Sequence, residues 1–258
     1  MTYRELLARH ADFRKLWTGQ AVSEVGDWLN NVSVFALAIQ LAGPGQAGRA
    51  LAIFAVARHL PLFVFGPLAG VVVDRLDRRR VMIASDLLRA VLALGFLAAD
   101  RLSSLPLIYG VGASMFAVSA FFNAARRAAV PNLVRDPDAL LTANSLAAST
   151  TAANIALGSA LGGLISTFAG RDFVFLLNAL TFLVSADMIR RIRSTMRRQG
   201  EREKGEGEGA EERLTDDVRE TTGTREEGSA TREGRATGDG RGRRGGSSSF
   251  PRSPFSLP

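Results

Sequence analysis

Four polar side chains interrupt a long apolar run near the N-terminus. They are Gln20, Glu24, Asp27 and Asn31. Their spacing of i, i+4, i+7 and i+11 would place all four on one face of a helix. Counted at about 1.5 Å per residue from Trp17, Asp27 would lie about 15 Å into the run. Carboxylates at that depth could accept a cationic or amphipathic solute, or take up and release a proton, so this face is the first candidate for a functional site.

A cation in the next apolar run is expected to face these acids. Arg58 lies about 12 Å from the N-terminal end of its run. If the two runs form antiparallel helices, Arg58 comes to a level close to that of Glu24 and Asp27. A neutralised ion pair that holds helices together and a role in lining a cavity explain this pattern equally well. Asn154, near the middle of a later run, is a further candidate for the same cavity.

Residue types exclude several other kinds of active site. The chain has 258 residues, no cysteine and two histidines, which rules out thiolate metal sites, cysteine nucleophiles and three-histidine or HExxH zinc sites. It contains no GxSxG motif, no close pair of intramembrane aspartates and no GxxxxGK[ST] loop. We therefore predict a protein that is not an enzyme and that uses no metal or other cofactor.

Six long apolar runs must position these residues. They cover residues 17–41, 50–73, 81–99, 105–125, 143–168 and 173–189. Each comes close to or exceeds the roughly 17–25 residues that cross the hydrocarbon core as a helix. We predict an all-α membrane protein with a cytoplasmic segment at 1–16 and a six-span domain at 17–198. The alternative is that the runs are buried helices of a large soluble domain. Such a domain would need far more polar surface than residues 1–198 provide.

The basic residues alternate along the chain in a way that indicates orientation. The segments before, between and after the six runs carry 4, 1, 4, 1, 3, 1 and 5 Lys or Arg residues. Loops rich in Lys and Arg stay on the cytoplasmic side of a membrane. We therefore expect a multi-pass protein of the plasma or inner membrane with both termini in the cytoplasm.

Other polar and small residues in the runs are interpreted as structural. Asp86 and Arg89, spaced i, i+3 near the cytoplasmic side, are expected to support the loop before them. Gly158 and Gly162, spaced i, i+4 with Gly163 beside them, let another helix backbone approach closely.

Residues 199–258 have the composition of a disordered cytoplasmic tail. They carry 11 Lys or Arg against 13 Asp or Glu, whereas residues 1–198 carry 21 against 12. Twelve glycines with only eight apolar residues cannot bury a core. The stretch Arg241-Gly-Arg-Arg is of a kind that contacts RNA, but the tail is net acidic and has no interleaved aromatic residues. We expect solvated disorder and no nucleic-acid partner.

The loop between the second and third runs resembles a transporter signature. It reads Gly66-Pro-Leu-Ala-Gly70-Val-Val-Val-Asp74-Arg75-Leu-Asp77-Arg78-Arg79-Arg80. The pattern is similar to G-x-x-x-D-R-x-G-R-R, which transporters of the major facilitator superfamily carry between helices 2 and 3, with Asp77 in place of its second Gly. On this resemblance, Gly70 allows close packing at the helix end, Asp74 sits at the start of the next unit, and the arginines hold the loop inside.

Two further stretches resemble one branch of that superfamily. Phe122-Asn-Ala-Ala-Arg126-Arg-Ala-Ala-Val-Pro131-Asn-Leu-Val134 is similar to the F-x-P-A-R-x-A-x-x-P-x-L-V stretch of enterobactin-type siderophore exporters and macrolide-efflux-type proteins. Gly158-Ser-Ala-Leu-Gly162-Gly163 resembles the antiporter motif G-P-x-x-G-G, with Ser159 in place of Pro. The resemblance covers about residues 10–195 and makes Arg126 and the three glycines supporting site residues.

The resemblance implies export of drug-like or siderophore-like small molecules by alternating access. In such transporters two six-helix halves rock about a site near the bilayer midplane. Because one half is recognised in this sequence, we expect an N-terminal half, truncated or followed by a frameshifted tail. The alternatives are a six-span half-transporter that acts as a homodimer, and a non-transporting remnant or scaffold. A six-span domain of an ATP-driven exporter would need a separate nucleotide-binding chain and leaves the Asp74–Arg80 loop unexplained.

The partners follow from the same reading. We expect the lipid bilayer, a small-molecule substrate and, as a coupling ion, protons. A missing C-terminal half or a second copy of the chain would complete the transporter.

Overall fold

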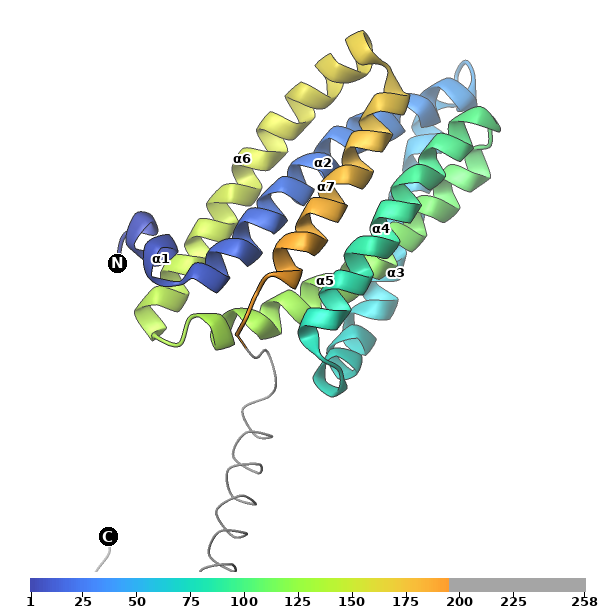
Figure 1. Cartoon of the computed structure of the whole chain (residues 1–258). Coiled ribbons are helices and arrows are strands. Elements are labelled where there is room, and N and C mark those ends of the chain that lie inside the picture. Colours follow the sequence, from blue (N-terminus) through green and yellow to red (C-terminus); the bar gives the residue numbers. More distant parts are fainter. Residues whose placement is uncertain (195–258) are drawn as a thin grey trace, which may run out of the picture. The chain divides into compact units, whose positions relative to one another are not determined.

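The computed structural model describes residues 1–194, and every regular element in this range is a helix. The elements are α1 (Tyr3–Arg9), α2 (Ala11–Ala42), α3 (Ala47–Arg75), α4 (Arg78–Arg101), α5 (Leu105–Leu133), α6 (Pro137–Ala169) and α7 (Arg171–Arg190) (Figure 1). The predicted all-helical fold is therefore confirmed for this part of the chain. The predicted tail at 199–258 lies outside the described residues.

Five helices are long and apolar enough to cross a membrane, judged by length and composition. These are α3, α4, α5, α6 and α7. The helix α2 has 32 residues, so it is long enough, but its polar side chains lower its hydropathy. Each of the six predicted spans lies within one helix.

Several helices extend well beyond their predicted spans. The helix α6 begins at Pro137, six residues before the predicted start, because the Asp136 side chain accepts a bond from the backbone N–H of Asp138 and proline suits a first helical turn. At the other side of this loop, α5 continues to Leu133, eight residues past the predicted end. Hydropathy does not detect such polar helix ends.

A short helix precedes the first predicted span. In α1, the Thr2 hydroxyl accepts from the backbone N–H of Glu5, and the Glu5 carboxylate accepts from the backbone N–H of Thr2 at 2.9 Å. This reciprocal capping box fixes the first turn. Leu6 is fully buried, which attaches the helix to the bundle.

The helices form one bundle in which α2 is central. It packs against α6 on one side and α7 on the other, while α4 lies between α7 and α5, and α3 packs against α5 (Figure 1). We call the end of the bundle that holds residues 11–15, 75–80, 126–137 and 190–194 the basic end. The opposite end is joined by Arg171, which contacts Asp100 at 3.3 Å and Gln40 at 2.6 Å.

Glycines let α6 and α2 approach closely. A Cβ added at Gly158 would lie 2.6 Å from the Cβ of Trp28, and one at Gly162 would lie 2.9 Å from the Cα of Leu29. Both distances are too short for an unshifted neighbour. A Cβ at Gly163 would meet nothing within 4 Å. The structure thus places the first two glycines in the helix contact and the third outside it.

At the basic end, Asp12 joins the start of α2 to the residues after α7. Its carboxylate accepts bonds from Lys15 at 2.7 Å and from the Ser194 hydroxyl at 2.6 Å. Burial alone would raise the pKa of Asp12, but the hydrogen bonds from Lys15 and Ser194 outweigh it and lower the pKa to about 2. The carboxylate is therefore ionised at neutral pH.

Candidate functional site

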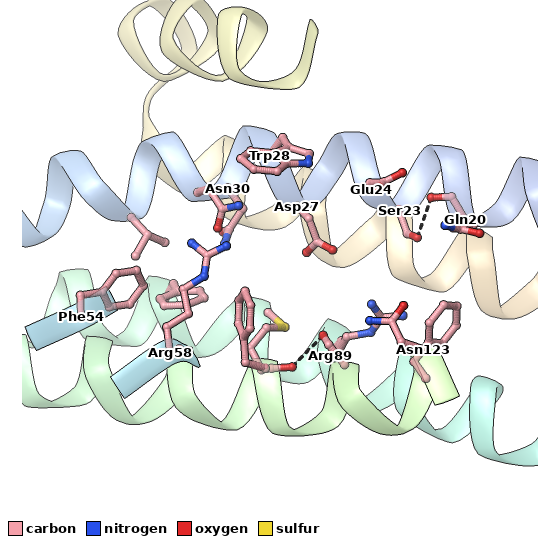
Figure 2. Close-up of a pocket in the computed structure, with 18 residues that line it drawn as sticks. Gln20, Ser23, Glu24, Asp27, Trp28, Asn30, Phe54, Arg58, Arg89 and Asn123 are labelled. Atoms are coloured by element: carbon pink, nitrogen blue, oxygen red, sulfur yellow. Dashed lines mark hydrogen bonds between the residues drawn. The ribbon is translucent and has the colours of Figure 1, made fainter. Parts of the chain in front are cut away.

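The polar face of α2 borders a cavity of about 200 Å³. The remaining walls come from α3, α4 and α5 (Figure 2). All four polar residues predicted from their spacing line this space, namely Gln20, Glu24, Asp27 and Asn31. We call it the central cavity.

Asp27 is the acid that is left unpaired in the central cavity. Figure 2 shows its carboxylate directed from α2 into the space. Within residues 1–194 it has no hydrogen bond and no ion pair. The charged groups that influence it most include Arg89 and Arg58, which approach from other helices. Asp27 is therefore available to a ligand or a proton.

Glu24, in contrast, is held by α6. Its Oε1 accepts a hydrogen bond from the Thr151 hydroxyl at 2.9 Å, and its Oε2 accepts one from Asn154 Nδ2 at 3.1 Å. Asn154 also donates to the carbonyl of Ala21 at 3.2 Å. Asn154 is buried and is absent from the lining of the central cavity, to which it is connected through its hydrogen bond to Glu24.

Arg58 lines the central cavity without forming the expected ion pair. Its guanidinium lies 4.2 Å from the centre of the Phe116 ring and 5.9 Å from that of Phe35. Its Nε is buried without a hydrogen-bond partner, and no acid of the described range lies within ion-pair distance. Figure 2 shows the side chain extending from α3 across the cavity toward α2. Arg58 thus lies in the lining of the central cavity and forms no ion pair with the described residues.

Asp86 and Arg89 are buried inside the helical bundle. They form an ion pair within α4 and are 0 % and 4 % exposed. The Arg89 guanidinium stacks 4.1 Å from the centre of Phe122 and 4.5 Å from that of Phe182. Arg89 also lines the central cavity. Through Arg89 the pair forms part of the cavity wall, a location that the expectation of a loop-supporting pair does not include.

Sequence reasoning missed the contribution of α5. Ser119 and Asn123, spaced i, i+4, line the central cavity, and so does Asn30 of α2, whose Oδ1 is buried without a hydrogen-bond partner in the described range. Two polar residues spaced i, i+4 in a span without charged residues were the sequence signal for this lining. Trp28 and Phe54 supply apolar walls.

The loop between α3 and α4 differs in detail from its expected roles. Asp77, at the position where the general motif has Gly, caps α4 by accepting from the backbone N–H of Arg79 at 2.9 Å. Asp74 instead lies exposed in the last turn of α3. A Cβ added at Gly70 would meet open space, so the expected close packing at this glycine is absent from the described residues.

Two arginines of this loop join three helices at the basic end. Arg78 donates from Nη1 to the carbonyl of Ala128 in α5 at 2.9 Å, and Arg79 donates to the carbonyl of Arg190 at the end of α7. A cation at a helix C-terminus stabilises its unpaired carbonyls. Arg75 and Arg80 are exposed.

Comparisons with known proteins identify the chain's relatives. A family profile described as "Transmembrane secretion effector" matches residues 7–223. Over 182 residues, 68 % of this chain and 42 % of the relative, the sequence is 32 % identical to "Putative bacilysin exporter BacE" of Bacillus subtilis. Over 78 residues, 30 % of this chain and 18 % of the relative, it is 35 % identical to "Macrolide efflux protein A" of Streptococcus pyogenes. No solved structure gave a significant match.

These relatives are longer than this chain. The match to BacE spans about two fifths of that relative's length. The predicted membership of a family of membrane transporters, which are not enzymes, is confirmed by the family match. The chain belongs to the transmembrane secretion effector family of major facilitator transporters.

Proposed function

We propose that the chain is a six-helix half of a small-molecule exporter and that the central cavity is its share of the substrate site. The observation that carries this proposal is Asp27, an unpaired carboxylate directed into a cavity inside an apolar bundle. A charge in the hydrocarbon region costs about 2.5–3.5 kcal/mol on insertion scales, so it is rarely kept without a use. The names of the relatives, which describe export and efflux, support outward transport.

In this proposal α2 is a sixth membrane span. Its polar face borders the central cavity, while its small residues Gly19 and Gly26 pack closely against α7. A helix surrounded in this way does not need an apolar surface all round, because other helices cover its polar groups. The large apolar side chains exposed on α3, such as Phe63 and Val56, are those that lipid would contact.

The basic end would then face the cytoplasm. The absence of cysteine makes the topology testable with single cysteines, because no native thiol has to be removed. A cysteine at Arg75, at the basic end, should react with an impermeant maleimide in inside-out vesicles and stay protected in intact cells. A cysteine at Ser103, between α4 and α5, should show the reverse. The opposite pattern for both positions would reverse the orientation.

The lining of the central cavity suggests a substrate with a cationic group and an apolar body. Asp27 offers a charge partner, and Trp28 and Phe54 offer aromatic side chains that attract both cations and apolar groups. The same carboxylate is the group through which protons would couple to transport.

Alternating access requires a second six-helix unit. That unit would be a further segment of the kind the longer relatives contain, or a second copy of this chain. Disulfide or chemical crosslinking in membranes separates these possibilities. A crosslinked homodimer would support the second, and a strictly monomeric chain would exclude it.

An efflux assay tests transport itself. Cells without their own drug pumps would express the chain, and retention of lipophilic cations would be measured for wild type, Asp27→Asn and the control Asp138→Asn. Asp138 is an exposed acid whose side chain has no partner in the described range. If a second copy of the chain supplies the second unit, we expect export by wild type and Asp138→Asn, and its loss in Asp27→Asn. Equal retention in all three and in empty cells would refute transport by this chain.

A further inference from the structure

A second cavity, of about 300 Å³, lies at the basic end between α2, α5 and α6. Its walls are mainly apolar and include Phe13, Trp17, Val130 and Leu140. Gln20 lines both this cavity and the central cavity, so the two spaces adjoin. We call the second space the basic cavity, because its charged lining residues are two arginines.

Arg126 is the main polar group of the basic cavity. Its Nε is buried and has no hydrogen-bond partner, and no acid pairs with it among residues 1–194. Glu24 is the acid that influences it, but both oxygens of Glu24 already accept bonds from Thr151 and Asn154. The cavity is lined by no acidic residue. A partly buried cation thus has no directly paired acid, and the nearest acidic influence, Glu24, is bonded to other groups.

Such an arrangement is costly unless an anion completes it. A buried polar group without a hydrogen bond costs roughly 1–3 kcal/mol, and more when it is charged. The planar guanidinium matches carboxylate and phosphate, which it binds through two parallel hydrogen bonds. Arg127, exposed beside Arg126, adds a second positive charge at the mouth.

We propose that the basic cavity binds an amphipathic anion, with its carboxylate or phosphate on Arg126 and its apolar body against Phe13 and Trp17. The charged lining differs from that of the central cavity, which Glu24 and Asp27 share with Arg58 and Arg89. The site is thus a second ligand site, and its occupation does not require transport. An anionic lipid of the adjoining leaflet and a soluble amphipathic anion share this chemistry.

The two tryptophans of the chain report on the two cavities separately. Trp17 lines the basic cavity and Trp28 lines the central cavity. In a Trp28→Phe background, Trp17 is the sole tryptophan of the 258 residues. Bromine quenches tryptophan fluorescence at short range, so brominated ligands can be titrated against Trp17 in the purified chain in neutral detergent.

Each of two pairs of probes compares an anion with an uncharged or zwitterionic molecule of similar apolar length, so that binding through charge is distinguished from apolar partitioning. One pair consists of soluble molecules and the other of lipids. The first pair is 11-bromoundecanoate and the uncharged 11-bromoundecanol, and the second is phosphatidylglycerol and phosphatidylcholine with brominated chains. We expect the anion of at least one pair to quench Trp17 more strongly than its uncharged or zwitterionic counterpart. Stronger quenching by bromoundecanoate identifies a soluble anion as a ligand, and stronger quenching by phosphatidylglycerol identifies a lipid.

Variants locate the effect at Arg126. Loss of a charge-assisted hydrogen bond should weaken anion binding about tenfold or more in Arg126→Gln. Arg126→Lys keeps the charge and should bind with intermediate affinity. Arg135→Gln removes a charge from an exposed arginine near the same end that does not line the cavity, and it should bind as wild type does.

Two outcomes would overturn the proposal. One is equal quenching by the charged and uncharged members of both pairs. The other is unchanged anion binding in Arg126→Gln with its circular dichroism and elution volume preserved. If Arg126→Gln does not fold, Ala147→Leu is compared with wild type instead. This substitution fills the apolar part of the cavity and should also abolish the anion-specific quenching. Because binding is measured without transport, a failure here is distinct from a failure of the export proposal.

Discussion

Replacing either of two neighbouring glycines in α6 by alanine should have opposite effects on stability. A Cβ at Gly162 would lie 2.9 Å from both the Cα and the carbonyl oxygen of Leu29 in α2, whereas a Cβ at Gly163 would meet nothing within 4 Å. The obstacle at Gly162 is backbone, so no side-chain rotation relieves it. The helices α2 and α6 must move apart instead.

The magnitude follows from two terms. Overpacking of a tight contact costs about 1–3 kcal/mol. Alanine stabilises a helix interior over glycine by about 0.5–1 kcal/mol, and this gain is common to both variants. We therefore expect Gly163→Ala to equal or slightly exceed wild type in its free energy of unfolding. The difference between Gly162→Ala and Gly163→Ala should be about 1–3 kcal/mol, because the common gain cancels.

The assay is reversible unfolding of the purified chain in mixed micelles, with an increasing fraction of denaturing detergent. Circular dichroism would follow helix content. Tryptophan fluorescence would follow the α2–α6 contact, since Trp28 packs against Gly158 and Trp17 donates a hydrogen bond to Thr150. If Gly162→Ala were as stable as Gly163→Ala, the close approach of α2 and α6 would be refuted.

Three further perturbations test local features. Asp77→Ala should lower the free energy of unfolding by about 1 kcal/mol because α4 loses its cap, whereas Asp74→Ala should change it by less than about 0.5 kcal/mol in the same assay. The pKa of Asp12 is lowered from 3.8 to about 2 in the folded chain, so its ionised form stabilises the fold above pH 3.8. This contribution is lost as the pH falls toward 2. The difference in free energy of unfolding between wild type and Asp12→Asn should therefore shrink over that pH range. Asn154→Ala should lower the thermal stability, and in that variant Glu24→Gln should lower it little further, because the two side chains share a hydrogen bond. If the two losses of stability add fully in a double-mutant cycle, the two residues are not coupled.

The sequence predicted the helices well because apolar run length dominates in a membrane protein. Its errors lie at helix ends, where Asp77 and Asp136 determine the start of α4 and α6 through hydrogen bonds that hydropathy does not detect. The short helix α1 carries too few apolar residues to give a span signal, and its capping box was the available clue.

The site was predictable on one helix and not across helices. The 3.6-residue period placed Glu24 and Asp27 on one face of α2, and that face does line a cavity. Which faces of the other helices meet it depends on packing angles that spacing along one chain segment does not encode. For that reason the sequence does not indicate that Arg89 lines the cavity, or that Asn154 reaches it through Glu24.

The proposed function requires a water-accessible charged cavity within a membrane bundle. Labelling of a single cysteine at position 27 tests this requirement most directly. In membranes, Asp27→Cys should react with a small charged methanethiosulfonate reagent, whereas Val91→Cys, an exposed position on α4 that lipid would cover, should not. Reaction at position 27 without reaction at position 91 is the expected result. An unreactive cysteine at position 27 from both sides of the membrane, in a chain that reacts normally at Arg75→Cys, would contradict the central cavity as a solute site.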